Sequence, residues 1–290
     1  MLLLCFLFLF ILLLFPETAA EGSKSGLLLW AGVLVPSLLP FSVLTSLIRR
    51  TMSGRRCQYL LLAAGILSGY PIGAKVAGEL YKDGVLSREK ALFFAGFTNN
   101  PSPMFVIFFV AGSMLGMGSG QYLFYALVLL SSLLGSLCFL LFTKNTRHAQ
   151  SAPVISAIAA PETPSAKSFS RLIDSEIASS ALLLIKIGGY IMFFSIFAAL
   201  LHQLPVIPYY AKLLLGGILE ITTGDAMIAA SPLSGHAKII LSLAATAFGG
   251  LSAAAQTNSV LQNTGLSFSR YVMIKVLAGL FGLLLGVLFF

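Results

Sequence analysis

Charge is what this sequence has least of. Only 10% of its 290 residues are Asp, Glu, Lys or Arg, whereas 58% are hydrophobic. A typical soluble domain has about 25% charged residues, so this composition excludes a soluble globular fold and indicates a polytopic membrane protein. The net charge of +8 comes from basic residues in short loops beside apolar runs. There they orient the chain and contact anionic lipid, so the charge predicts membrane lipid and no nucleic acid as a partner.

Residues that bind metals or catalyse reactions are also few. The three cysteines, Cys5, Cys57 and Cys138, have neither the pairing nor the spacing of a disulfide framework or a zinc site. No serine stands in a Gly-x-Ser-x-Gly motif. An intramembrane aspartyl protease would need paired aspartates, and Asp225 is the one aspartate inside an apolar segment. We therefore expect that the protein is not an enzyme and binds no cofactor. Sodium or a proton is expected only as a possible coupling ion for transport.

The apolar run from Met1 to Phe15 is shorter than the roughly 20 residues of an upright membrane helix. Because no basic residue precedes it, we expect a retained short helix, with a cleaved signal peptide as the alternative. The next span, Gly26 to Ile48, ends in a cluster of four arginines, which places that end in the cytoplasm. Further apolar segments are Tyr59–Tyr81, Ala91–Met117, Tyr122–Phe142, Ala181–Leu204, Tyr209–Ala230, Ala237–Leu261 and Tyr271–Phe290.

Polar breaks interrupt four of these segments. The stretch Asn99–Pro103 contains two prolines, which a continuous helix cannot accommodate. Other breaks are expected at Ser68–Gly73, Thr222–Asp225 and Gly249–Gly250. In hydrocarbon an unpaired backbone group costs several kcal/mol unless it faces protein, water or a ligand. Broken helices at mid-membrane are therefore typical of transporter binding sites, and a proline kink packed against its neighbours is the alternative for Asn99–Pro103.

The break in Tyr59–Tyr81 decides the topology. If this segment crosses the membrane, the basic stretch 143–179 would lie outside the cell. If it folds back at Gly69 to Gly73 as a re-entrant hairpin, the loop around Lys82 and that stretch both stay in the cytoplasm, in agreement with their charge. We therefore predict an all-α fold with broken helices and re-entrant hairpins.

Weak internal similarity suggests a duplication. A shift of 180 residues brings Gly69 onto Gly249 and Lys90 onto Arg270, and a shift of 153 aligns the segments that begin at Pro40 and Phe193. Because the two units would have opposite orientations, the sequence predicts two inverted-topology repeats. The predicted division is a short membrane helix with its connector (1–25), a first repeat (26–142), a cytoplasmic linker (143–179) and a second repeat (180–290).

The breaks supply the predicted solute site. We expect one half to contain Ser68, Gly69, Tyr70, Pro71, Gly73, Lys75, Thr98, Asn99, Asn100, Pro101 and Ser102, and the other half Gly249, Gly250, Ser252, Gln256 and Asn258. Lys75 would attract an anionic solute, or would be neutralised by Glu79 four residues later. Lys212 and Lys275, nearer the ends of their spans, are expected to extend to the membrane interface.

The predicted coupling-ion site consists of Glu220, Thr222 and Thr223, a carboxylate beside hydroxyl groups. Two alternatives for Glu220 stay open. It could cap the half-helix that follows it, or it could pair with Lys186.

Several of these stretches resemble one known family. The segments Phe15–Glu17, Gly26–Trp30, Pro36–Phe41, Ser68–Lys75, Thr98–Asn100 and Leu219–Thr222 are similar to sporulation integral membrane proteins of endospore-forming bacteria. Those proteins carry the nucleoside-recognition, or Gate, domain and are related to concentrative nucleoside transporters. The resemblance covers almost the whole chain.

The resemblance implies a multi-pass protein of the bacterial membrane that transports a small organic anion. In the sporulation members the substrate is dipicolinic acid, which crosses the outer forespore membrane. A nucleoside-like solute and a non-transporting assembly protein of sporulation are the alternatives. The expected partners are the solute and membrane lipid, with a homo-oligomer as a further candidate.

Overall fold

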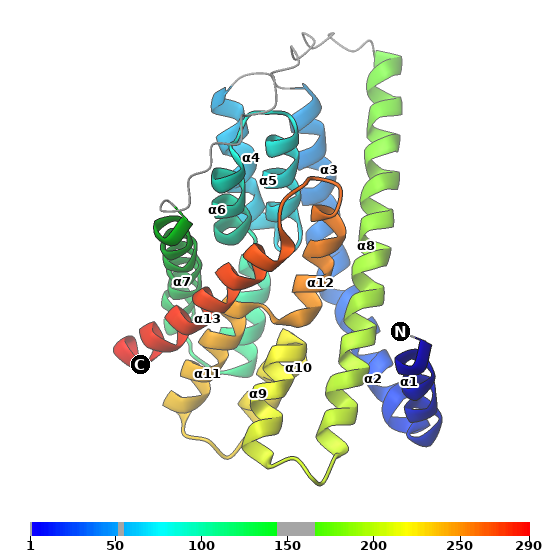
Figure 1. Ribbon diagram of the computed structural model, residues 1–290, viewed down its shortest axis with the longest axis vertical. Helices are drawn as coiled ribbons and strands as arrows, with labels where there is room; N and C mark the ends of the chain where they lie inside the picture. Colours follow the sequence, from blue (N-terminus) through cyan, green and yellow to red (C-terminus); the bar gives the residue numbers. More distant parts are fainter. Residues whose placement is uncertain (1, 52–54, 144–165) are drawn as a thin grey trace.

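The computed structural model describes residues 2–51, 55–143 and 166–290, and every regular element in those residues is a helix (Figure 1). The all-α prediction is therefore confirmed for the described part of the chain. The elements are α1 (Leu2–Leu14), α2 (Pro16–Leu29), the π-helix η1 (Trp30–Leu34), α3 (Val35–Thr51), α4 (Arg55–Ser68), α5 (Ile72–Lys82), α6 (Arg88–Thr98), the π-helix η2 (Met104–Met114), α7 (Gly120–Thr143), α8 (Ala166–Gln203), α9 (Tyr209–Leu219), α10 (Ile221–Ala230), α11 (Gly235–Phe248), α12 (Gly250–Leu261) and α13 (Phe268–Phe289).

Within residues 2–51, 55–143 and 166–290, four stretches are long and apolar enough to cross a membrane, so the protein is polytopic. They coincide with four of the predicted spans and cover Gly120–Phe142, Ser170–Gln203, Gly235–Leu261 and Phe268–Phe289. A fifth crossing results if the helical stretches Pro16–Leu34 and Leu38–Ile48, which meet at 57°, count as one span. The π-helix η1 and Pro36 lie at this bend, and both are common causes of a helix kink.

The N-terminal region is helical almost throughout. The predicted short helix is present as α1, and most of the predicted connector up to residue 25 belongs to α2. Helix α2 packs closely on α8. The absence of a side chain on Gly26 allows this approach, since a Cβ atom there would lie only 2.8 Å from Met192 Cα. Helix α8 begins at Ala166, so the end of the predicted linker 143–179 is helical, while residues 144–165 lie outside the described part of the chain.

Two pairs of short helices form hairpins. Helices α4 and α5 turn back at Gly69–Pro71, and α9 and α10 turn back at Glu220. In each hairpin two glycines face each other: a Cβ on Gly65 would lie 2.7 Å from Gly73 Cα, and a Cβ on Gly224 would overlap the backbone of Gly217. Only residues without side chains allow backbones to approach this closely. In Figure 1, α4 and α5 lie in the upper half of the molecule and α9 and α10 in the lower half.

Two longer helices are interrupted. Helix α6 ends at Thr98, and the chain is irregular until η2 begins at Met104. Helix α11 gives way to α12 at Gly249, whose φ of 89° is a left-handed conformation that glycine adopts without strain. The predicted breaks at Ser68–Gly73, Asn99–Pro103 and Gly249–Gly250 are therefore confirmed.

The fourth break was predicted at Thr222–Asp225 and lies earlier, at Glu220. The side chain of Glu220 accepts hydrogen bonds from the first free amides of α10. These bonds allow the helix to begin at Ile221, so Thr222 to Asp225 are helical.

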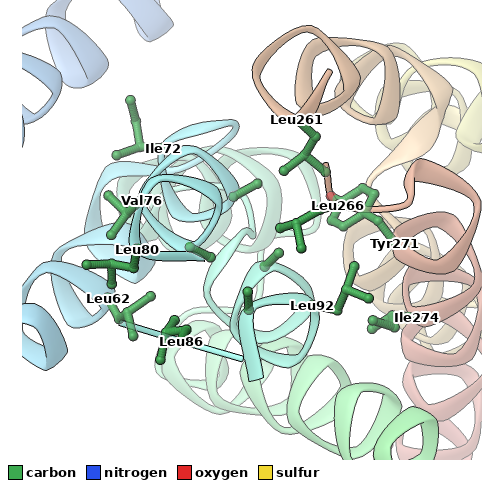
Figure 2. Packing of buried hydrophobic residues seen from close by; sticks show 14 of the residues in the cluster. Leu62, Ile72, Val76, Leu80, Leu86, Leu92, Leu261, Leu266, Tyr271 and Ile274 are labelled. Atoms are coloured by element: carbon green, nitrogen blue, oxygen red, sulfur yellow. The ribbon is translucent and has the colours of Figure 1, made fainter. Parts of the chain in front are cut away.

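Apolar side chains from both halves of the chain share a core beside the breaks. Figure 2 shows Ile72, Val76 and Leu80 of α5 in one cluster with Tyr271 and Ile274 of α13. Helix α13 also packs closely against α7. A Cβ on Gly135 would lie 2.7 Å from the backbone nitrogen of Ala278. The C-terminal helix thereby reaches the helix breaks of the N-terminal half.

Candidate functional site

A cavity lies where the four breaks meet. Each break contributes to its wall: Gly69 and Tyr70 from α4–α5, Pro101 and Ser102 from α6–η2, Glu220, Ile221 and Thr222 from α9–α10, and Ser252, Ala253 and Gln256 from α12. Apolar residues complete it: Leu29, Leu34, Leu38, Phe105 and Ile191. The free volume is about 50 Å³, which is room for a few water molecules. A mostly apolar wall with a few converging polar groups is typical of small-molecule sites.

The cavity brings together part of the predicted site. Eight predicted residues line it: Gly69, Tyr70, Pro101, Ser102, Ser252 and Gln256 of the predicted solute site, with Glu220 and Thr222 of the predicted ion site. The other predicted residues are not part of this lining: Ser68, Pro71, Gly73, Lys75, Thr98, Asn99, Asn100, Gly249, Gly250, Asn258 and Thr223.

Asn99 connects the α6–η2 break to three other helices. Its amide nitrogen donates hydrogen bonds to Thr257 Oγ1 of α12 and Tyr271 Oη of α13, both at 2.9 Å. Its amide oxygen accepts from the backbone nitrogen of Ala74 in α5 at 3.3 Å. All atoms involved are buried, so this side chain holds the break in place by fully internal hydrogen bonds.

Asn100 binds a buried lysine. Its amide oxygen accepts hydrogen bonds from Ser132 Oγ of α7 at 2.6 Å and from Lys275 Nζ of α13 at 2.9 Å. The same ammonium group lies 3.4 Å from the carbonyl oxygen of Asn99 and 5.5 Å from the centre of the Tyr70 ring. In the described part of the chain, the partners of Lys275 are thus amide and carbonyl oxygens and an aromatic ring, with no carboxylate among them.

The prediction that Lys275 extends to the membrane interface is wrong. Only 2% of this residue is exposed, because it lies on the face of α13 that packs against the α6–η2 break. The break leaves carbonyl groups at the end of α6 without helical partners. The negative end of the helix dipole is at the same place, so a cation is stabilised there.

Tyr70 has a hydroxyl group without a partner. Its Oη atom is buried and makes no hydrogen bond to any described residue. The hydroxyl lies against the backbone of Gly249, where any Cβ atom would overlap it. Tyr70 is also one of the residues that line the cavity.

Glu220 caps helix α10. Its two carboxylate oxygens accept hydrogen bonds from the backbone nitrogens of Thr222 at 3.1 Å and Thr223 at 2.7 Å. The capping alternative is therefore confirmed. Lys186 is exposed on α8. The role of Glu220, Thr222 and Thr223 in ion coupling stays a prediction.

Lys75 lies away from the cavity. Its ammonium group is 3.5 Å from Ser46 Oγ on α3, and the residue is only partly buried. A contact between Lys75 and a solute stays a prediction.

Thr98, another residue of the predicted site, donates a hydrogen bond from its hydroxyl to the carbonyl oxygen of Phe94 in its own helix.

Several buried polar residues were not included in the predicted site. They are Ser132, Asp225, Thr246, Tyr271 and Lys275, all at most 2% exposed. Each stands in an otherwise apolar helix, and polar residues in such helices are the signal that could have identified them. Among the described residues, no group of three His, Cys, Asp or Glu side chains could hold a metal ion.

Comparison with known proteins gives one relative. The chain is a distant homologue of the sporulation integral membrane protein YlbJ of Bacillus subtilis (strain 168), with 27% identity over an alignment of 315 positions. The alignment covers 92% of this chain and 76% of that protein. No protein-family model matches the chain, and no solved structure matches it. The chain is thus a multi-pass integral membrane protein related to a sporulation membrane protein of Bacillus.

Proposed function

We propose that this protein is a transporter that moves a small organic anion through the cavity at the helix breaks, with dipicolinate as the leading substrate. The observation that carries this proposal is the convergence of four helix breaks on one cavity. Half-helix ends leave backbone N–H and C=O groups free to bind a solute at mid-membrane. A protein with a purely structural role in the membrane would have no need for four such breaks at one place.

The order of the elements supports two inverted repeats. In the first half, the α2–α3 pair is followed by the hairpin α4–α5, the broken helix α6–η2 and α7; in the second half, α8 is followed by the hairpin α9–α10, the broken helix α11–α12 and α13. The two hairpins lie in opposite halves of the molecule (Figure 1).

The register of these repeats differs from the 180-residue shift found in the sequence. Gly65 contacts Gly73 in the first hairpin, and Gly217 contacts Gly224 in the second, so by position Gly65 would correspond to Gly217 and Gly73 to Gly224. The 180-residue shift instead paired Gly69 with Gly249, which belong to a hairpin and a broken helix respectively.

Positive partial charges favour an anion in the cavity. The lining residues Tyr70 and Ser102 lie two residues before the first residues of α5 and η2, and Ser252 lies in the first turn of α12. Helix N-termini attract anions. The Lys275 ammonium lies 5.5 Å from the ring of Tyr70, so it adds positive potential at the cavity wall. Together with the resemblance to sporulation membrane proteins, these features make the dicarboxylate dipicolinate our leading substrate.

A nucleoside-like solute is the second candidate, because Glu220 also lines the cavity. A carboxylate in the wall favours hydroxyl and amino groups, which can donate hydrogen bonds to it.

We further propose that the protein lies in the outer forespore membrane of a sporulating bacterium. It would have no enzymatic activity, and sodium or a proton would be its coupling ion.

Uptake into vesicles tests this function. Purified full-length protein is reconstituted into liposomes, and uptake of labelled dipicolinate is measured with a nucleoside and an unrelated dicarboxylate as competitors, with and without sodium or proton gradients. We expect saturable uptake that only close dipicolinate analogues block. Competition by the nucleoside would select the second candidate. Uptake of none of these solutes under any gradient would refute the transport proposal in favour of an assembly role.

The variant Tyr70→Phe tests whether the cavity is the transport site. Removing a buried hydroxyl that has no partner leaves the folded state at least as stable. If the hydroxyl binds the solute, KM for uptake should rise about tenfold, which corresponds to about 1.4 kcal/mol. Tyr125→Phe is the matched control, because Tyr125 also has a buried hydroxyl without a partner but does not line the cavity. An equal KM for both variants would contradict the proposed site.

A further inference from the structure

Asp225 is a buried carboxylate with an unused oxygen. The residue is fully buried in α10, one helical turn after Ile221, which lines the cavity. One carboxylate oxygen, Oδ2, accepts a hydrogen bond from Thr246 Oγ1 of α11 at 3.2 Å. The other oxygen, Oδ1, has no hydrogen-bond partner among the described residues. Ser242, one turn before Thr246, also faces this carboxylate, and its buried hydroxyl has no partner either.

No basic side chain of the described residues neutralises Asp225. The charged group that interacts with it is Glu220, whose negative charge makes the site more unfavourable for a second anion. Of the lysines on the helices around α10, Lys238 and Lys212 donate to backbone carbonyl oxygens, and Lys186 is exposed on α8. The remaining neighbour, η2, contains no ionisable residue. A bare buried carboxylate costs several kcal/mol, so this group requires a positive ligand.

The geometry points to a sodium ion: we propose that Asp225, Ser242 and Thr246 form a binding site for one Na⁺. The site offers oxygen atoms only, which hard cations prefer. A single carboxylate balances a monovalent charge, whereas divalent cations generally recruit several acidic ligands. A proton on Asp225 would also neutralise the charge, and the experiment below distinguishes it from sodium. A cation between the two unpartnered oxygens satisfies both.

The ion would join the two elements that carry its ligands. Asp225 belongs to the hairpin α9–α10, and Ser242 and Thr246 belong to the broken helix α11–α12. Glu220 and Ile221, at the start of α10, line the cavity, so sodium would hold the helix that carries this part of the wall against α11. A role as coupling ion rests on the proposed transport function, but binding of the ion does not.

Thermal unfolding of the purified full-length protein in detergent tests the site without any solute. The apparent Tm is measured over a range of NaCl concentrations, with choline chloride and KCl at equal ionic strength. A ligand that binds the folded state raises stability with its concentration. We expect a saturable increase in NaCl, its loss in Asp225→Asn and at least a tenfold higher half-saturating concentration in Ser242→Ala. Asp174→Asn, which removes an exposed carboxylate of α8, should respond like the wild type.

Two results would overturn the sodium site. The first is an equal Tm of the wild type in NaCl and choline chloride. The second is a Tm that depends on pH but not on sodium and loses this dependence in Asp225→Asn, which would identify a proton instead. If Asp225→Asn does not fold, Ser242→Ala and Thr246→Val decide, because both keep the carboxylate. Solute uptake without sodium binding would contradict only the site, and sodium binding without uptake would contradict only the transport function.

Discussion

The contact between α5 and the α6–η2 break allows a quantitative test. Gly73 is the residue of α5 that touches this break. A Cβ atom there would lie 2.5 Å from the carbonyl oxygen of Thr98 and 2.8 Å from the backbone nitrogen of Asn99. Ordinary van der Waals contact begins near 3.4 Å, so Gly73→Ala must displace one backbone by about 1 Å. Both neighbours are backbone atoms, and no flexible side chain can move aside.

Crowding of this kind in a packed interior costs about 1–3 kcal/mol. The matched control is Gly189→Ala on α8, because a Cβ atom on Gly189 would have no neighbour within 4 Å. Both changes replace a helical glycine with alanine, which favours the helix by at most about 1 kcal/mol in each case. The two variants should therefore differ by about 1–3 kcal/mol in stability, with Gly73→Ala the less stable.

The assay combines the apparent Tm of the purified protein with vesicle uptake. Gly73→Ala should unfold several degrees below Gly189→Ala, since about 1 kcal/mol corresponds to roughly 2–4 °C for a domain of 150–250 residues. It should also lose uptake, because the displacement stretches the 3.3 Å hydrogen bond between the backbone nitrogen of Ala74 and Asn99 Oδ1. Equal Tm and equal uptake of the two variants would refute the close α5–α6 contact and the role of the break.

Further predictions concern single side chains at the breaks. Lys275→Met should reduce uptake at least tenfold while Lys186→Met, an exposed lysine on α8, leaves uptake unchanged; equal uptake would show that the buried cation is dispensable. Asn100→Ala should abolish uptake without preventing membrane insertion, because it removes the oxygen shared by Ser132 and Lys275, and fractionation of the membranes checks insertion. Glu220→Ala should destabilise the protein by about 1 kcal/mol through loss of the α10 cap, measured by thermal unfolding.

The class of protein and most of the helix breaks could be predicted from the amino-acid sequence. Hydropathy over long segments defines spans because a helix in hydrocarbon must be apolar on most of its surface. The breaks around Gly69, Asn99–Pro103 and Gly249 were predictable because proline removes an amide donor and glycine permits a left-handed φ. These effects act within a few residues of the chain, so no knowledge of the packing is needed to see them.

Which polar groups face one another could not be predicted, because it depends on how the helices pack. Lys275 and Asp225 stand in apolar segments, and the sequence does not show whether such a side chain is buried or extends to the membrane interface. They are buried because the face of the helix that carries each of them packs against other helices. The fourth break lies at Glu220 and not at Thr222 to Asp225, because the Glu220 carboxylate accepts hydrogen bonds from the first amides of α10. These bonds stabilise a helical conformation of Thr222 to Asp225. The close packing of the two helices within each hairpin likewise depends on contacts between glycines of different helices. Contacts between segments far apart in the chain leave no periodic pattern, so they become visible only in the folded protein.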